Sequence, residues 1–195
     1  MGAIHYNLGN SSHLGGMAPA PVPGGGFGAA ALPPGMAGMP GTYIIVNTTT
    51  NNRYIGIAND IGVRFNTRLA TITEMGFAPA QMAAIGVTWG QTSCQNTPTA
   101  FIPAPPWVVA VPAPPAAYTA MIDGNPVNLE RLLIRFIITQ LGAGGTVSNN
   151  AMAVAPYTNP TPNAITVRLT WGGMGGLFVP NFLQAVWNPG AMNAW

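Results

Sequence analysis

The sequence predicts an α/β (α+β) domain in which a small three-stranded antiparallel sheet is flanked by helices. Two runs of β-branched and aromatic residues, 42–46 and 53–58, are separated by a polar turn and predict a β-hairpin. Segments 60–70 and 128–141 carry apolar residues every three or four positions, which is the helical period. A further apolar run at 85–90 predicts the third strand.

The first predicted helix follows directly on the hairpin. Asp60 can accept hydrogen bonds from the free N–H groups of the first turn, so it is expected to cap the helix. Arg64 and Arg68 are four residues apart and therefore share one edge of this helix. The apolar residues recur every four positions and are expected to face the core: Ile61, Phe65 and Leu69.

The second predicted helix is the clearest of the chain. Either Asn128 or the Asp123-Gly124 turn opens it, and Gly142 stands just past its end. Glu130 lies on a face next to the apolar one. The apolar face is expected to be buried and consists of Leu129, Leu132, Leu133, Phe136 and Ile137.

The rest of the chain is expected to be irregular. Residues 1–40 are rich in Gly, Pro, Ala and Met and carry no charge, which predicts an N-terminal arm. Residues 91–120 are a Pro-rich insertion, with one plausible strand at 107–111, in a domain spanning 41–150. Residues 151–195 form an Asn-, Pro- and Gly-rich C-terminal extension with one strand, at 165–171.

Charge limits the partners of this chain. Charged residues make up only 5% of its 195 residues, lysine is absent, and the net charge is +2. Non-specific DNA affinity grows with the number of phosphates neutralised, so such a chain cannot be a general polyanion binder. Any nucleic-acid contact must be local, and all but one of the arginines lie within 41–150: Arg53, Arg64, Arg68, Arg131 and Arg135.

The hairpin and first helix carry a motif. Gly41-Thr42-Tyr43 on the first strand is followed by Tyr54-Ile55-Gly56 on the second, and then by Arg64 on the helix. The residues, their spacing and the strand-strand-helix context resemble the GIY-YIG endonuclease superfamily. The resemblance covers residues of about 41–150.

The resemblance implies an active site that hydrolyses phosphodiester bonds. Tyr43 would be the general base, Tyr54 would position water or phosphate, and Arg64 would bind the scissile phosphate. Glu130, with apolar residues after it, resembles the family's metal ligand; Glu74 is the competitor. A single carboxylate suits Mg²⁺, which usually keeps water and phosphate ligands.

Other residues are expected to support this site. Arg68 falls where many family members carry a histidine or another basic residue, and Arg53 and Arg68 are expected to bind substrate. Asn149 or Asn150 stands nearest to the asparagine that family members often place after the acidic helix. Purely structural roles remain open for these residues: cross-strand packing for Tyr43 and Tyr54, and a solvated surface position for Glu130.

Two functions follow. The first is a metal-dependent DNA endonuclease acting as a toxin or secreted effector, with DNA as its partner. The alternative is a catalytically weak or inactive scaffold in a self-assembling structural protein, such as a filament, coat or other homo-oligomer, joined through the apolar arms.

The ends of the chain and its cysteine content bear on location. Residues 1–10 lack a basic segment followed by an apolar run, so no secretory signal peptide is expected. No apolar run is long enough to predict a membrane span. Cys94 is the single cysteine, which excludes an internal disulfide. A cytoplasmic location and export by a leaderless route are both compatible with these features.

Overall fold

The structure is a computed structural model, and its description covers residues 1–13, 21–22, 26–27, 33–70, 85–96, 108–109, 119–141, 146–149, 155–172 and 182–191. Within these ranges the fold is mostly β, with two helices. The longer strands are β1 (Gly2–His13), β4 (Gly41–Asn47), β5 (Asn52–Ala58), β6 (Ile85–Gln95), β11 (Ile165–Trp171) and β12 (Phe182–Trp187). The helices are α1 (Ile61–Ala70) and α2 (Leu129–Leu141). The shorter strands are β2 (Pro21–Val22), β3 (Gly26–Phe27), β7 (Val108–Val109), β8 (Thr119–Ile122), β9 (Asn125–Asn128) and β10 (Thr146–Val147).

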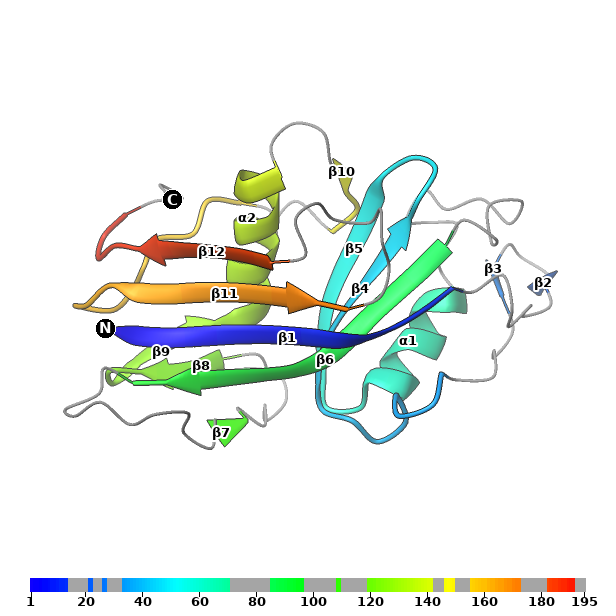
Figure 1. Cartoon of the computed structure of the whole chain (residues 1–195), viewed down its shortest axis with the longest axis horizontal. Coiled ribbons are helices and arrows are strands. Elements are labelled where there is room, and N and C mark those ends of the chain that lie inside the picture. The colour runs from blue at the N-terminus through cyan, green and yellow to red at the C-terminus, as the bar shows by residue number, and fades with distance from the viewer. Residues whose placement is uncertain are drawn as a thin grey trace.

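One mixed sheet organises the described part of the chain. Its order is β10-β5-β4-β6-β1-β11-β12, with β7 paired to β6. The pairs β1–β11 and β10–β5 are parallel, and the other pairs of the sheet are antiparallel. The sheet curls strongly, so that β4 and β5 run steeply across the direction of β1, β11 and β12 (Figure 1).

The expected fold class is therefore wrong: the sheet is larger than expected, and strands rather than helices make up most of the described structure. The sheet is not a small three-stranded one, because segments expected to be irregular supply its centre and one side. β1 lies between β6 and β11, although residues 1–40 were expected to form an arm. β11 and β12 extend the sheet from the C-terminal segment, where only β11 was expected.

The strand character of β1 has a simple physical origin. Ile4, Tyr6 and Leu8 are buried and alternate with the more exposed residues His5 and Asn7. A period of two is the mark of a strand. The Gly-, Pro- and Ala-rich composition of residues 1–40 as a whole obscures this short alternation.

The expected insertion at 91–120 is also corrected at both ends. β6 continues to Gln95, and β8 begins at Thr119 and pairs with β9. The Asp123-Gly124 turn joins these two strands, and both residues have positive φ, 49° and 78°. This turn therefore does not open α2. Asn128 does, because its Oδ1 accepts a hydrogen bond from Arg131 N at 2.9 Å.

The predictions for the hairpin and the second helix are confirmed. β4 pairs with β5 in an antiparallel register with Ile44 opposite Ile55. The predicted apolar face of α2 is fully buried: Leu129, Leu132, Leu133, Phe136 and Ile137 are at most 1% exposed. On α1, Ile61 and Phe65 are buried, while the side chain of Leu69 lies outside the described residues.

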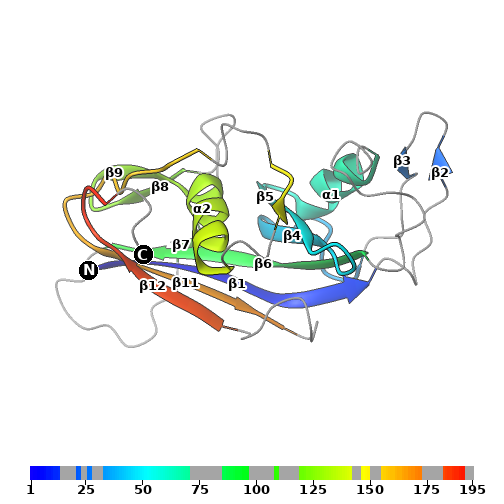
Figure 2. The same cartoon turned by 90° about the horizontal axis from the view of Figure 1, so that it is seen from above.

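Two cores lie on opposite faces of the hairpin. Ile44, Val46, Ile55 and Ile57 pack with α2 and the inner faces of β1 and β11. The second core contains the alternate residues of the same strands (Tyr43, Ile45, Tyr54 and Ala58), together with Ile61 and Phe65 of α1 and Val87 and Trp89 of β6. Figure 2 shows α2 and α1 one after the other along the curled sheet. The hairpin is thus the wall between the two cores, and it carries the motif.

Candidate functional site

The two motif tyrosines lie on the α1 face of the hairpin. Tyr43 on β4 pairs with Gly56, and Tyr54 on β5 pairs with Ile45, so the tyrosines are diagonal neighbours on one face. Their ring centroids are 6.3 Å apart. The guanidinium carbon of Arg68 lies 5.0 Å from the centroid of the Tyr54 ring, which is a cation–π arrangement.

Gly56 leaves the space that the Tyr43 ring occupies. A Cβ atom at position 56 would come within 2.5 Å of the Tyr43 hydroxyl oxygen and still closer to the ring carbon that bears it. No side chain can be accommodated there unless Tyr43 moves. The glycine that ends the second motif is therefore tied physically to the tyrosine that ends the first.

Tyr43 is a buried, neutral phenol. Its side chain is 0% exposed, and its hydroxyl makes no hydrogen bond of ordinary geometry within the described ranges. The hydroxyl is nevertheless close enough to Tyr54 to lower the pKa of that phenol. Burial raises the pKa of Tyr43 strongly, and Tyr54 and Glu130 raise it further. The positive charges of Arg64 and Arg68 lower the same pKa. Tyr43 can therefore lose its proton only when more positive charge is brought to it.

α1 is anchored at its N-terminus by side-chain and backbone contacts. Asp60 Oδ1 accepts a hydrogen bond from Val63 N at 3.1 Å, which confirms the predicted cap. The preceding loop adds two bonds, from Ile61 N to Met39 O at 2.9 Å and from Gly62 N to Met36 O at 3.1 Å. The first-turn N–H groups are thus satisfied, and the helix is fixed over the tyrosines.

Arg64 and Arg68 are half-buried on this anchored helix. The charges of both arginines lower the pKa values of Tyr43 and Tyr54, so both guanidinium groups lie close to the tyrosines. Sequence spacing placed them on one edge of the helix. The structure turns that edge toward the motif tyrosines.

Side chains close the outer edge of β5 beyond the short strand β10. Ser148 N donates to Arg53 O at 2.7 Å, which ends the backbone pairing. The Asn149 carboxamide then takes the place of a paired strand: it accepts from Ile55 N at 3.1 Å and donates to Ile55 O at 2.8 Å. The Glu130 Oε2 atom accepts from Ile57 N at 3.3 Å.

Glu130 therefore reaches from α2 to the β5 edge beside the tyrosines. Burial raises the pKa of Glu130, while the Ile57 N–H, Arg64 and Arg68 lower it. Both arginines also act on Tyr43 and Tyr54. One carboxylate, two guanidinium groups and two phenols thus share one electrostatic environment, although they come from β4, β5, α1 and α2.

The donor chemistry is compatible with Mg²⁺. No group of three or more His, Cys, Asp or Glu side chains gathers in the described part of the chain. Mg²⁺ needs no such cage, since one or two carboxylates with water and substrate phosphate usually hold it. Glu130 would be that carboxylate, and Tyr43 lies in the same electrostatic environment.

The other residues predicted for the site either lie away from the tyrosines or fall outside the described part of the chain. Arg53 is 3% exposed at the hairpin turn, where its guanidinium donates to Asn51 O at 2.9 Å and to Asn51 Oδ1 at 2.5 Å. It lies near the turn, whereas Tyr43 lies toward the opposite end of the hairpin. Glu74 and Asn150 lie outside the described residues.

Sequence reasoning missed the loop that fixes α1. Met36 and Met39 supply their backbone carbonyl oxygens to the helix N-terminus, and Met36 is fully buried. The Pro33-Pro34-Gly35 sequence before them is a recognisable turn signal. This turn does not stand out within residues 1–40, because the neighbouring residues have the same Gly-, Pro-, Ala- and Met-rich composition.

No helix within the described ranges has the length and apolar character needed to cross a membrane. Comparisons of the chain with models of known protein families, with curated proteins and with solved structures gave no match.

Proposed function

We propose that this protein is a metal-dependent endonuclease that hydrolyses phosphodiester bonds of DNA, distantly related to the GIY-YIG endonucleases. One observation carries the proposal. The residues that the family resemblance selects, Tyr43, Tyr54, Arg64 and Glu130, come from four different elements, and Arg64 and Glu130 both shift the pKa values of the two tyrosines. Arg68 joins them through its contact with the Tyr54 ring.

The roles follow from the chemistry of each group. Glu130 would hold Mg²⁺, which when bound acidifies a coordinated water and neutralises charge on the phosphate. Arg64 would bind two phosphate oxygens and stabilise the charge that develops as the bond breaks. Arg68 holds Tyr54 through its contact with the ring, and Tyr54 positions the phosphate or the water.

Tyr43 has the most demanding role, that of general base. Its burial favours the neutral phenol, so proton acceptance from the attacking water requires the phenolate to be stabilised. Arg64 and Arg68 already lower its pKa, in the direction that the role needs. The Mg²⁺ that Glu130 would hold adds the further positive charge that the phenolate needs, and it offsets the negative charge of the phosphate.

A plasmid-nicking assay tests the proposal. The protein is expected to nick supercoiled DNA in Mg²⁺ and not in EDTA. Arg64→Ala should slow nicking by about a hundredfold, the usual cost of losing a group that stabilises transition-state charge. Arg168→Ala is the matched control, because Arg168 is exposed on β11 and bonded to Gln184. Equal losses in the two variants would contradict the assignment of Arg64.

One observation favours a second candidate, a scaffold that assembles with copies of itself. β12 ends the described sheet, and its sequence from Phe182 to Trp187 has neither a charge nor a proline. Edge strands are normally protected by such residues, because their free N–H and C=O groups can pair with another chain. β12 of one copy would pair with β12 of another, which extends the sheet across two molecules.

A further inference from the structure

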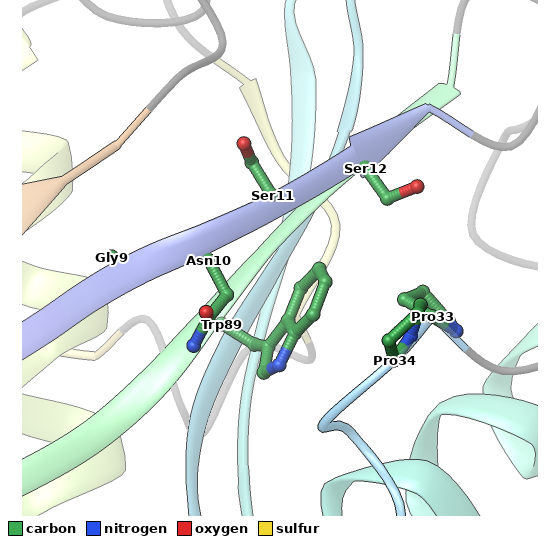
Figure 3. A pocket seen from close by; sticks show the side chains of 7 residues that line it. All are labelled: Gly9, Asn10, Ser11, Ser12, Pro33, Pro34 and Trp89. Atoms are coloured by element: carbon green, nitrogen blue, oxygen red, sulfur yellow. The ribbon is translucent and has the colours of Figure 1, made fainter.

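An open pocket lies on the α1 side of the sheet, where β1, β6 and the loop before β4 meet. Its volume is about 350 Å³, and its lining residues are Gly9, Asn10, Ser11, Ser12, Pro33, Pro34 and Trp89. Figure 3 shows Asn10 and Ser12 on the side of β1 that faces Trp89 and the two prolines. The pocket has the size of a small-molecule site.

The position of the pocket is fixed by the backbone. The register of β1 against β6 shifts between Asn7 and Asn10, so a bulge redirects the end of β1. Gly90 allows β6 to approach β1 closely at this point, because a Cβ atom on Gly90 would collide with the backbone carbonyl of Asn7. On the other side, Pro33 O accepts a hydrogen bond from Met36 N at 3.1 Å, in the loop that also anchors α1.

Side chains that can form hydrogen bonds line the pocket. Trp89 is 3% exposed, yet its indole N–H has no hydrogen-bond partner within the described ranges. Because the indole nitrogen itself is buried, a ligand in the pocket would contact the Trp89 ring rather than this N–H. The Asn10 carboxamide adds a donor and an acceptor, and the Ser12 hydroxyl adds one of each. The rings of Pro33 and Pro34 form an apolar wall.

The lining also defines what the pocket can bind. None of the lining residues is charged. A phosphate would meet no cation in this pocket. A flat, neutral group could instead form hydrogen bonds along its edge with Asn10 and Ser12 and pack its face against the rings of Pro33 and Pro34. A nucleobase is such a group, and a side-chain carboxamide pairs bidentately with the edge of adenine.

The pocket lies in register with the proposed active site. Tyr43 pairs with Trp89 across β4–β6, and Trp89 pairs with Asn10 across β6–β1. Paired residues point to the same face of a sheet, so these side chains form one row. Two strand spacings separate the backbones of Tyr43 and Asn10, which is about 10 Å. That separation suits a nucleotide close to the one being cleaved.

We propose that the pocket between Asn10, Ser12, Trp89 and Pro33-Pro34 binds a nucleobase, adenine foremost, near the phosphate that the proposed nuclease hydrolyses. This inference rests on the proposed function for the identity of the substrate. The recognition itself needs no metal and no cleavage. The two claims can therefore be tested separately.

The test uses tryptophan labelled with ¹⁵N at the indole and free nucleosides as probes. The chain has five tryptophans, and Trp89→Phe identifies the Trp89 signal. Adenosine, guanosine, cytidine, thymidine and, as a sugar control, glucose are titrated into the full chain without Mg²⁺. Adenosine is expected to shift the Trp89 signal saturably, and Asn10→Ala should weaken this binding about tenfold or more. Asn188→Ala, at an exposed site outside the pocket, should leave it unchanged.

Three outcomes would overturn the inference: no nucleoside shifts the Trp89 signal, glucose alone shifts it, or Asn10→Ala binds as tightly as the wild type. Repeating the titration on Glu130→Ala separates the two claims. A nucleoside shift combined with a wild type that never nicks DNA removes the proposed nuclease and keeps the pocket. Nicking without a shift removes the pocket and keeps the nuclease.

Discussion

Tyr43 and Gly56 lie opposite each other on the β4–β5 ladder, and a Cβ atom on Gly56 would come within 2.5 Å of the Tyr43 hydroxyl oxygen. Gly56→Ala should therefore displace Tyr43 and destabilise the fold by about 1–3 kcal/mol, the usual cost of overpacking a core. Urea denaturation measures this change. Gly9→Ala is the control, because the nearest atom to its added Cβ is 3.5 Å away. If both variants are equally stable, Tyr43 does not need the space over Gly56.

The Asn149 carboxamide completes the edge of β5 through its two hydrogen bonds to Ile55. Asn149→Ala leaves a buried backbone N–H and C=O unpaired, so the free energy of unfolding should fall by about 1–3 kcal/mol. Hydrogen exchange at the Ile55 amide should become faster. Asn149→Asp can still accept from Ile55 N but cannot donate to Ile55 O, so an intermediate loss is expected. A wild-type exchange rate in Asn149→Ala would show that water replaces the carboxamide without cost.

Glu130 should make stability depend on pH in a defined direction. Burial raises its folded-state pKa above the ordinary 4.5, so folding favours the protonated form. The group's contribution to stability is complete below 4.5 and is lost as pH rises through the raised pKa. Relative to Glu130→Gln, which does not titrate, the wild type should be more stable in acid than near neutrality. Urea denaturation of both proteins across this range measures the difference, and a constant or reversed difference contradicts the raised pKa.

The same titration bears on the proposed activity. A carboxylate must be ionised to hold a metal ion, so nicking should increase as pH rises through the raised pKa of Glu130. The acid side of the rate profile is therefore expected above the ordinary value for a glutamate. A profile that falls off only near 4.5 or below would show that a different group limits activity.

The position of β12 at the end of the described sheet predicts self-association. If two copies pair there, sedimentation velocity should show a dimer or larger species, and Val186→Lys should shift it toward the monomer because a charged side chain protects an edge strand. Val186 is 39% exposed and pairs with Thr166 on β11. Thr166→Lys is the matched control, because it places the same charge one strand inside the edge. A wild type that remains monomeric at high concentration removes the scaffold candidate.

Local patterns were enough to predict the hairpin and both helices. Their signals lie within short windows: the polar turn after Val46, the spacing of Ile61 and Phe65, and the apolar face of α2. The intervals between Tyr43, Tyr54 and Arg64 also sufficed to choose residues that the fold brings together.

The rest of the sheet depends on distant pairings. β1 runs parallel to β11, with Ile4 opposite Val167, and no local turn joins the two segments. Tyr6 OH donates to Leu129 O at 2.7 Å, which ties the same strand to the start of α2. The alternation within each segment is typical of a strand, but it does not indicate which distant strand is the partner. The pocket at Asn10 and Trp89 could not be foreseen, because it exists only once β1 lies beside β6.

We propose that the environment shared by Tyr43, Tyr54, Arg64, Arg68 and Glu130 is a metal-dependent phosphodiesterase site. The most direct measurement is the rate of plasmid nicking in Mg²⁺ for the wild type and for Glu130→Gln. Glutamine can still accept the hydrogen bond from Ile57 N but has no charge with which to hold the metal. The wild type is expected to nick DNA, and the variant is expected to fold normally but to be at least about a hundredfold slower. Equal rates, or a wild type that does not nick DNA at all, would contradict this proposal.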